Sequence, residues 1–246
     1  MFGKSNKTLY KIKEIKNNSV VVHHHLGLGD SIICNGIINY LTSALNITVY
    51  LPVKENYLEM ISFLYIENKK VKIFPVKNET RDKDIENFSE DNKLDILKIG
   101  FDKIKKDQFN KSFYKQLEIP YEYTYEYFLL PQNKTLNNEL KKHLYDYYNI
   151  KGTNHTLVHN ESSLEKYELN ILDTENVIYI NKESDIFGNI FLYTDLIMSA
   201  KEIHCINGSF LHLVERIKTP SKLYYHHLRK NNMYLSDKWE WVDYEN

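Results

Sequence analysis

The order of apolar and polar positions predicts a chain in which strands alternate with helices. The unbroken apolar run at 20–22 is typical of a strand buried on both faces, so we expect a strand at 19–25. Apolar residues then repeat at helical spacing over 30–44, where Asp30 is a suitable N-cap. The chain therefore begins with a strand, a glycine-containing turn and a helix.

Similar patterns continue through the first half of the chain. They predict strands at 47–51, 71–76 and 94–99 and helices at 54–65 and from Gln108 onward. The short connections imply parallel strands with right-handed crossovers. We expect the polar stretch 77–93 to be a surface loop and the aromatic stretch 121–130 to be extended.

A second α/β unit follows a predicted helix at 136–148. It has expected strands at 156–159, 177–180, 202–206 and 223–225 and expected helices at 190–200 and 209–217. The fold class predicted is α/β, with two Rossmann-like domains facing a central cleft. The domains are 1–132 and 133–233, and the aromatic tail 234–246 is expected to dock on the body. A single doubly wound sheet is the alternative.

Composition and charge narrow the class of protein. The 246 residues are 42% hydrophobic and 13% aromatic, enough to form a core, and the net charge of -1 gives no general field for nucleic acid. No apolar run reaches the ~18 residues of a membrane span, and no signal peptide is recognisable. We therefore expect a cytoplasmic protein, with peripheral membrane association left open, in which Cys34 and Cys205 are reduced.

Glycines cluster where the first strand meets its helix. Gly27, Gly29 and Gly36 fall within ten positions, although the whole chain has eight glycines. Such a turn suits an anion bound at a helix N-terminus, but a tight turn without a ligand remains the alternative. The pattern is neither a Walker motif nor a full GxGxxG, because Ile32 stands at the third glycine position. Asp30 is expected to be ionised there and able to accept a proton, or to serve only as a cap.

A second strand-turn-helix junction occurs late in the chain. Asn207, Gly208 and Ser209 follow an apolar strand, and His212 lies one helical turn later. Ser209 could cap the helix and direct its hydroxyl toward a phosphate. The competing interpretation is a serine cap with a core histidine.

Three consecutive histidines end the first strand. On a strand their side chains alternate between faces, so His23, His24 and His25 cannot all face one metal ion. Only His25 is close enough to the glycine turn to meet a ligand. We expect no metal site.

Both junctions together resemble the heptosyltransferase-like glycosyltransferases of the GT-B fold. The matching segments are His-Leu-Gly-Leu-Gly-Asp-Ser-Ile and Ile-Asn-Gly-Ser-Phe-Leu-His-Leu. The resemblance implies an inverting transfer from a nucleotide sugar to a glycan or glycoconjugate hydroxyl, with no cofactor and no obligatory metal. Asp30 matches the family's catalytic base, and Gly208, Ser209 and His212 match the turn that holds the donor diphosphate. Asn207 stands where the family commonly has Asp.

Further donor contacts are expected in the second domain. Ser162 lies in the segment that occupies the place of the family's phosphate loop, although that segment lacks the Pro and Gly of the loop. The departing diphosphate needs a cation, for which Arg229 is the first candidate and Lys166 the second. Glu215 could accept hydrogen bonds from the donor ribose. Each of these residues could instead be an ordinary surface or helix residue.

Two other functions fit the same pattern. One is a non-catalytic protein that binds a nucleotide or a sugar phosphate on the same scaffold. The other is a different α/β enzyme, such as an epimerase or an NAD-linked enzyme.

Overall fold

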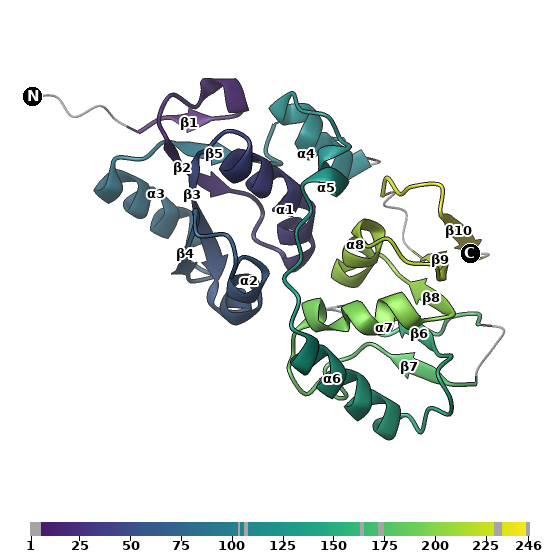
Figure 1. The fold of residues 1–246 in the computed structure, drawn as a ribbon. Helices are drawn as coiled ribbons and strands as arrows, with labels where there is room; N and C mark the ends of the chain where they lie inside the picture. Colours follow the sequence, from purple (N-terminus) through teal and green to yellow (C-terminus); the bar gives the residue numbers. More distant parts are fainter. Residues whose placement is uncertain are drawn as a thin grey trace, which may run out of the picture. The chain divides into compact units, whose positions relative to one another are not determined.

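The chain forms two compact α/β units. The computed structural model describes residues 6–102, 104–105, 108–162, 165–171, 175–228 and 233–244. Unit 1 is Met1–Pro131 and unit 2 is Gln132–Asn246. Each unit holds one five-stranded sheet in which every strand pair is parallel (Figure 1). The predicted α/β fold with two Rossmann-like parts is confirmed, and the alternative of a single sheet is wrong.

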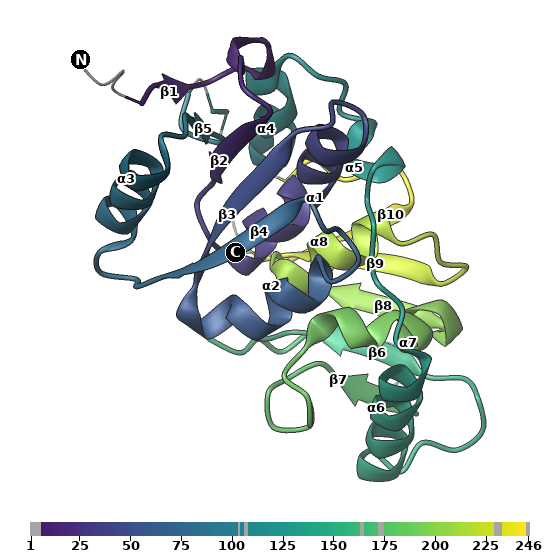
Figure 2. The same cartoon turned by 60° about the vertical axis from the view of Figure 1, so that its left-hand side comes forward.

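Unit 1 has the strand order β1-β5-β2-β3-β4. Its strands are β1 (Thr8–Leu9), β2 (Ser19–His23), β3 (Thr48–Lys54), β4 (Val71–Val76) and β5 (Ile96–Lys98). Its helices are α1 (Leu28–Ser43), α2 (Leu58–Leu64), α3 (Arg81–Asn92), α4 (Phe109–Leu117) and α5 (Tyr123–Glu126), with single 3-10 turns η1 (Ile12–Glu14) and η2 (Glu55–Tyr57). Figures 1 and 2 show α1 and α3 on opposite faces of this sheet.

Helix α3 occupies the stretch that the sequence predicts as a loop. Ile85 is fully buried and packs with Val21 and Leu26, while Phe88 lies stacked against Phe74. Two apolar side chains one turn apart therefore hold a helix whose other positions are mostly charged. The loop prediction is wrong because tertiary packing supplies what the weak apolar pattern does not show.

Helix α5 replaces the first part of the predicted extended run at 121–130. It packs against α1 at Gly36, where an added Cβ would collide with the carbonyl oxygen of Tyr123. The aromatic side chains of this segment then contact one another and α1, as Tyr40 does with Tyr123 and Tyr127. The extended prediction is wrong at this point because close helix packing decides the backbone.

Unit 2 has the strand order β10-β9-β8-β6-β7. Its strands are β6 (Thr156–His159), β7 (Val177–Tyr179), β8 (Glu202–Cys205), β9 (Lys222–His227) and β10 (Trp239–Asp243). Its helices are α6 (Lys134–Tyr147), α7 (Thr194–Ser199), preceded by the 3-10 turn η4 (Ile190–Tyr193), and α8 (Ser209–Arg216). The predicted docking of the aromatic tail is confirmed, because β10 is an edge strand paired along its whole length with β9.

Each sheet has one point at which the order of its strands reverses. In unit 1 the chain proceeds from β2 toward β3 and β4 and later places β5 on the other side of β2. In unit 2 the same reversal separates β6 from β8. Ligands of open parallel sheets bind outside the carboxyl ends of the strands at such a point. Among the described residues, no helix is long and apolar enough to cross a membrane.

Candidate functional site

The glycine turn lies at the strand reversal of unit 1. Leu26 after β2 adopts a left-handed conformation with φ 60, and its backbone N–H donates to Nδ1 of His24 over 3.0 Å. Helix α1 then begins at Leu28 with Gly27 as its N-cap. Gly27 has an ordinary φ of -77, but a Cβ there would lie 2.6 Å from Oδ2 of Asp30. Glycine is therefore required for close approach of this carboxylate, and Gly29 follows in the first turn.

Asp30 is a residue of the first helical turn and not the N-cap that the sequence predicts. The N-cap lies three residues earlier, at Gly27, which leaves room for the Asp30 side chain to fold back over the N-terminus. Burial raises the pKa of the Asp30 carboxyl, while charge on His25 and the N–H of Gly27 oppose that rise. The expectation that the helix N-terminus would dominate the pKa is wrong, because desolvation is the larger effect.

His25 is held against the carboxyl end of β5. Its Nε2 lies 2.7 Å from the carbonyl oxygen of Gly100, and because a carbonyl only accepts, Nε2 carries the proton. The rings of Phe101, Phe109 and Phe113 surround the imidazole with centroid distances of 4.7 to 5.7 Å. In the neutral ring Nδ1 is left as an acceptor at the end of the sheet that carries Asp30.

The other two histidines of this run have different partners. His23 is buried with Nε2 at 3.5 Å from Oδ1 of Asp82 on α3. His24 is buried and accepts the backbone N–H of Leu26. Burial lowers the pKa of His23 to about 4 and that of His24 to about 3, so both are neutral at physiological pH. Of the three, His25 is the one beside the glycine turn.

The second turn, formed by Asn207, Gly208 and Ser209, lies at the strand reversal of unit 2. It connects β8 to α8, and its N-cap is Gly208 with an extended backbone at φ -174. A Cβ at Gly208 would lie 2.7 Å from Cε1 of His159, which ends the neighbouring strand β6. Burial lowers the pKa of His159 to about 4. The turn and the end of β6 are thus packed against one another through a neutral imidazole.

Ser209 does not cap α8 as predicted, whereas His212 is the core histidine that the competing interpretation expects. Ser209 is the first residue of α8, since Gly208 is the cap, and it is half-buried. His212 is 5% exposed, and burial lowers its pKa to about 3. Its Nδ1 is buried and has no hydrogen-bond partner within the described ranges. His212 is therefore a neutral interior residue of the helix that Gly208 opens.

Glu215 binds the C-terminal segment. Its carboxylate accepts hydrogen bonds from the backbone N–H and the hydroxyl of Ser236, each over 3.0 Å, and from Nε1 of Trp239 over 2.6 Å. Nζ of Lys238 lies 3.7 Å away. These partners belong to β10 and to the segment that leads into it, so we exclude Glu215 from the ribose contact suggested by the sequence.

The segment after β6 folds back on itself. Ser162 donates its backbone N–H to the carbonyl of Glu165 over 2.9 Å and accepts the N–H of Glu165 on its hydroxyl over 3.1 Å. Asn160 exchanges two hydrogen bonds with Tyr167, of 2.7 and 2.9 Å. Lys166 lies between these two anchors. Arg229, the first cation candidate, lies outside the described residues.

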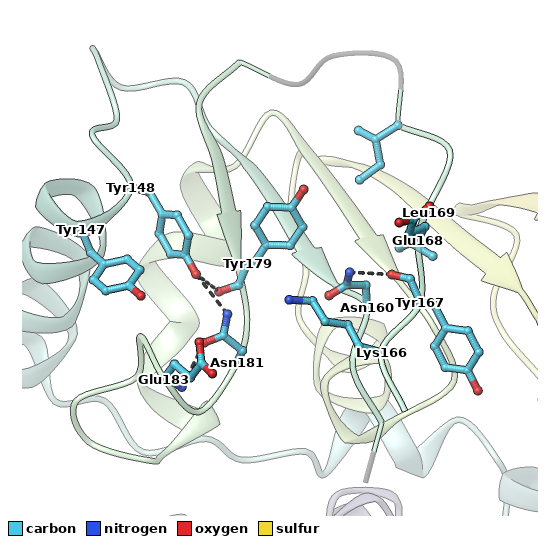
Figure 3. Close-up of a pocket in the computed structure, with 11 residues that line it drawn as sticks. Tyr147, Tyr148, Asn160, Lys166, Tyr167, Glu168, Leu169, Tyr179, Asn181 and Glu183 are labelled. Atoms are coloured by element: carbon cyan, nitrogen blue, oxygen red, sulfur yellow. Dashed lines mark hydrogen bonds between the residues drawn. The ribbon is translucent and has the colours of Figure 1, made fainter. Parts of the chain in front are cut away.

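A pocket of about 720 Å³ opens beside these strand ends in unit 2. Its lining includes Tyr148, Asn160, Lys166, Tyr179 and Asn181. Figure 3 shows the Lys166 ammonium group between the side that carries Tyr148 and Asn181 and the side that carries Asn160. The hydroxyl of Tyr148 donates to the carbonyl of Tyr179 over 3.0 Å and accepts from the Asn181 amide over 3.1 Å. A pocket of this size accepts a ligand as large as a nucleotide.

Sequence reasoning missed the wall of this pocket formed by the end of β7. Asn181 is the first polar residue after the short strand, and Glu183 follows two positions later. The same reasoning that selected Asn207 after β8 applies to them, because parallel strands end at one edge of the sheet. Tyr148 could not be found in this way, since it follows a helix.

Comparisons with known proteins find similarity in structure and none in sequence. No protein-family model and no curated protein matches the chain. The fold is similar to a glycosyl transferase family 9 structure from Veillonella parvula DSM 2008, with 8% identity, a TM-score of 0.52 and coverage of 93% of this chain and 86% of that one. It is also similar to E. coli heptosyltransferase WaaC with ADP, with 11% identity, a TM-score of 0.45 and coverage of 92% and 90%. The first likeness shows a shared fold, that of GT-B glycosyltransferases.

Proposed function

We propose that this chain is a glycosyltransferase that moves a sugar from a nucleotide-sugar donor to a hydroxyl of a glycan acceptor. The observation that carries the proposal is the pocket at the carboxyl edge of the unit 2 sheet, with Lys166 inside it. It occurs in a chain whose fold is similar to that of a family 9 glycosyltransferase over 93% of its length. Unit 1 has a partly buried carboxylate, that of Asp30, at its own strand reversal.

Asp30 is the proposed general base. A base must be deprotonated and yet hold a proton well in the transition state, which favours a carboxylate whose pKa lies above its usual range. Burial raises the pKa of Asp30 in this direction. In the proposed reaction its carboxylate takes the proton from the acceptor hydroxyl, and Gly27 keeps the space that the carboxylate occupies.

The acceptor oxygen then attacks the anomeric carbon of the donor in one step. The new carbon–oxygen bond forms as the bond to the diphosphate oxygen breaks, on opposite faces of the carbon, and the configuration inverts. Negative charge develops on the departing diphosphate and needs prepositioned positive groups. We assign this role to the Lys166 ammonium group and to the backbone N–H groups at the start of α8, where Gly208 and Ser209 lie.

The proposal needs neither a cofactor nor a metal ion, because Lys166 supplies the cation. A turn that accepts phosphate without a metal depends on close approach of the ligand to the backbone. Gly208 provides this at the head of α8, although its contact with His159 also explains the glycine. The proposed donor set is therefore Lys166, the Gly208–Ser209 turn and Ser162, with Glu215 omitted.

Replacement of Asp30 by Asn tests the enzymatic proposal. Asn keeps the shape of the side chain and cannot accept the proton, so we expect nucleotide binding within about twofold of wild type and transfer lowered by about 10²- to 10⁴-fold. Binding is measured by calorimetry and transfer by release of the nucleotide from a sugar donor.

The same variant tests the first alternative, and nicotinamide fluorescence tests the second. A non-catalytic binding protein has no transfer in the wild type and no change in Asp30→Asn. An NAD-linked enzyme or epimerase would quench nicotinamide fluorescence on mixing with the dinucleotide. Wild-type transfer that survives undiminished in Asp30→Asn contradicts the assignment of the base.

A further inference from the structure

A line of hydrogen bonds crosses unit 2 from the sheet to the wall of the pocket. Nδ1 of His204 on β8 lies 2.9 Å from Nε2 of His226 on β9. Nδ1 of His226 lies 2.6 Å from the hydroxyl of Tyr244, just after β10. That hydroxyl accepts the backbone N–H of Asn170 over 2.9 Å. The Tyr244 hydroxyl thus connects the histidines of β8 and β9 with the segment around Asn170, which precedes Tyr244 by 74 residues in the sequence.

Along this line each group donates a hydrogen bond to the next group, from Tyr244 to His226 and from His226 to His204. Because Tyr244 accepts the N–H of Asn170, its own O–H is available to donate to Nδ1 of His226. Nε2 of His226 then carries the ring proton and donates to Nδ1 of His204. The remaining nitrogen of His204 carries a proton toward the carboxylate of Glu202, 3.7 Å away. Both histidines are neutral in this arrangement, and Nε2 of His204 is left without a hydrogen-bond partner among the described residues.

Asn170 belongs to the segment 165–171, which forms one wall of the pocket. Lys166, Tyr167, Glu168, Leu169 and Ile171 of this segment line it. One end of the segment is held by the pair of hydrogen bonds between Asn160 and Tyr167. The bond from Asn170 to Tyr244 holds the other end. Tyr167 and His226 also line one small cavity of about 10 Å³, so the line of hydrogen bonds runs directly behind the wall.

We propose that Tyr244 is a positioning residue that fixes the pocket wall, and with it Lys166, by anchoring Asn170 to the C-terminal strand of the sheet. The ligand class is the anionic nucleotide of the proposed function, and the inference rests on that function. Tyr244 is not among the residues that line the pocket. Its contribution is to reduce the number of arrangements that the wall adopts before binding, which lowers the entropic cost of ordering it.

The test compares Tyr244→Phe with the matched control Tyr224→Phe. Tyr224 lies on β9 and stacks on His204 with centroids 4.6 Å apart, and its hydroxyl makes no hydrogen bond to any described residue. Both substitutions keep the ring and remove one hydroxyl. A melting temperature close to that of wild type shows that each variant is folded.

The first readout is hydrogen exchange without ligand. In Tyr244→Phe we expect the amide of Asn170 and its neighbours in 165–171 to exchange about tenfold faster, since the acceptor is lost. Tyr224→Phe should exchange as wild type does. Unchanged exchange in Tyr244→Phe overturns the anchor, whatever the protein binds.

The second readout is binding of the tightest ligand among UDP, GDP, ADP, CMP and dTDP. Loss of one hydrogen bond predicts a Kd raised about fivefold in Tyr244→Phe, with the donor KM raised and kcat at saturating donor unchanged. Faster exchange with an unchanged Kd overturns the positioning role. If wild type binds none of the five nucleotides, the proposed function fails, and that failure is visible before any variant is made.

Discussion

At the scale of single residues, the spacing between Gly27 and Asp30 is the most sensitive feature of unit 1. An alanine Cβ at 27 would meet Oδ2 of Asp30 at 2.6 Å, while its φ of -77 suits alanine. The carboxylate is a movable side-chain end, so we expect Gly27→Ala to fold with a stability loss of about 1 kcal/mol or less. Asp30 would be displaced, and transfer should fall at least about tenfold. Wild-type transfer rates in a folded Gly27→Ala variant would contradict the role of this contact.

The direction of the Asp30 pKa gives a second prediction at this scale. The base acts when deprotonated, and burial raises its folded pKa above 3.8. Activity should therefore fall as the pH decreases through a value above that of an ordinary aspartate. The measurement is kcat/KM against pH with circular dichroism at each point. A lower limb at or below 3.8 would contradict the assignment.

Sequence reasoning found Asp30 and misjudged its surroundings. The residue type after a glycine turn indicates a carboxylate at a helix start, which the structure has. The position of the cap and the sign of the pKa shift depend on side-chain packing around the loop, which spacing along the chain does not reveal. Glu215 shows the same limit, because its partners come from Ser236 and Trp239, more than twenty residues later.

At the scale of elements, the contact between the start of α8 and the end of β6 should be intolerant of added volume. In Gly208→Ala the new Cβ would lie 2.7 Å from Cε1 of His159, whose ring is held against Phe210. Overpacking of this kind costs about 1–3 kcal/mol. Urea denaturation monitored by circular dichroism should show that loss. Gly152→Ser is the control for added volume, because no atom lies within 4 Å of the added Cβ. Its positive φ of 79 adds backbone strain of its own. A Gly208→Ala variant as stable as wild type would contradict the contact.

The attachment of β10 depends on the buried carboxylate of Glu215. It is 1% exposed and accepts from Ser236 and Trp239. Glu215→Gln keeps the shape but replaces one acceptor oxygen with a donor, so a buried partner is left unsatisfied at a cost of about 1–3 kcal/mol. Tryptophan fluorescence during urea unfolding measures this, with the exposed Glu240→Gln on β10 as the control. Equal stability of the two variants would contradict the anchoring role.

Most strands were predictable, whereas helix α3 and strand β10 were not. Strand β2 is an apolar run bounded by turns, and such a run specifies a buried parallel strand locally. Helix α3 has few apolar positions, and β10 has the alternating residues of an edge strand at the end of an aromatic tail. Both depend on a partner surface formed by distant residues, and neither could be assigned from its own segment.

At the scale of the whole molecule, buried neutral histidines make the fold sensitive to acid. Burial lowers the pKa of His23, His159 and His226 to about 4 and that of His24 and His212 to about 3. Unfolded histidine titrates near 6.5, so between pH 6.5 and these values the unfolded chain binds more protons and stability falls as pH falls. Each such histidine contributes about 1.4 kcal/mol per pH unit.

We therefore expect the free energy of unfolding to decrease steeply between pH 6.5 and 5. Urea denaturation at half-unit steps of pH measures it. Replacing His24 by Gln, which keeps an acceptor for the N–H of Leu26, should reduce the slope. A stability that is constant over this interval would contradict neutral buried histidines.

The central claim is that unit 2 binds a nucleotide in the pocket that holds Lys166, and a thermal-shift titration tests it most directly. The ligands are UDP, GDP, ADP, CMP and dTDP. The proteins are wild type, Lys166→Met and the control Lys182→Met. Lys182 is an exposed residue beside Asn181 that does not line the pocket. Ligand at 100 times its Kd stabilises the native state by about 2.7 kcal/mol. We predict a raised Tm for wild type and Lys182→Met with at least one nucleotide, and a loss of about tenfold in affinity for Lys166→Met. No shift for wild type with any of the five at millimolar concentration, or equal shifts for all three proteins, would contradict the account.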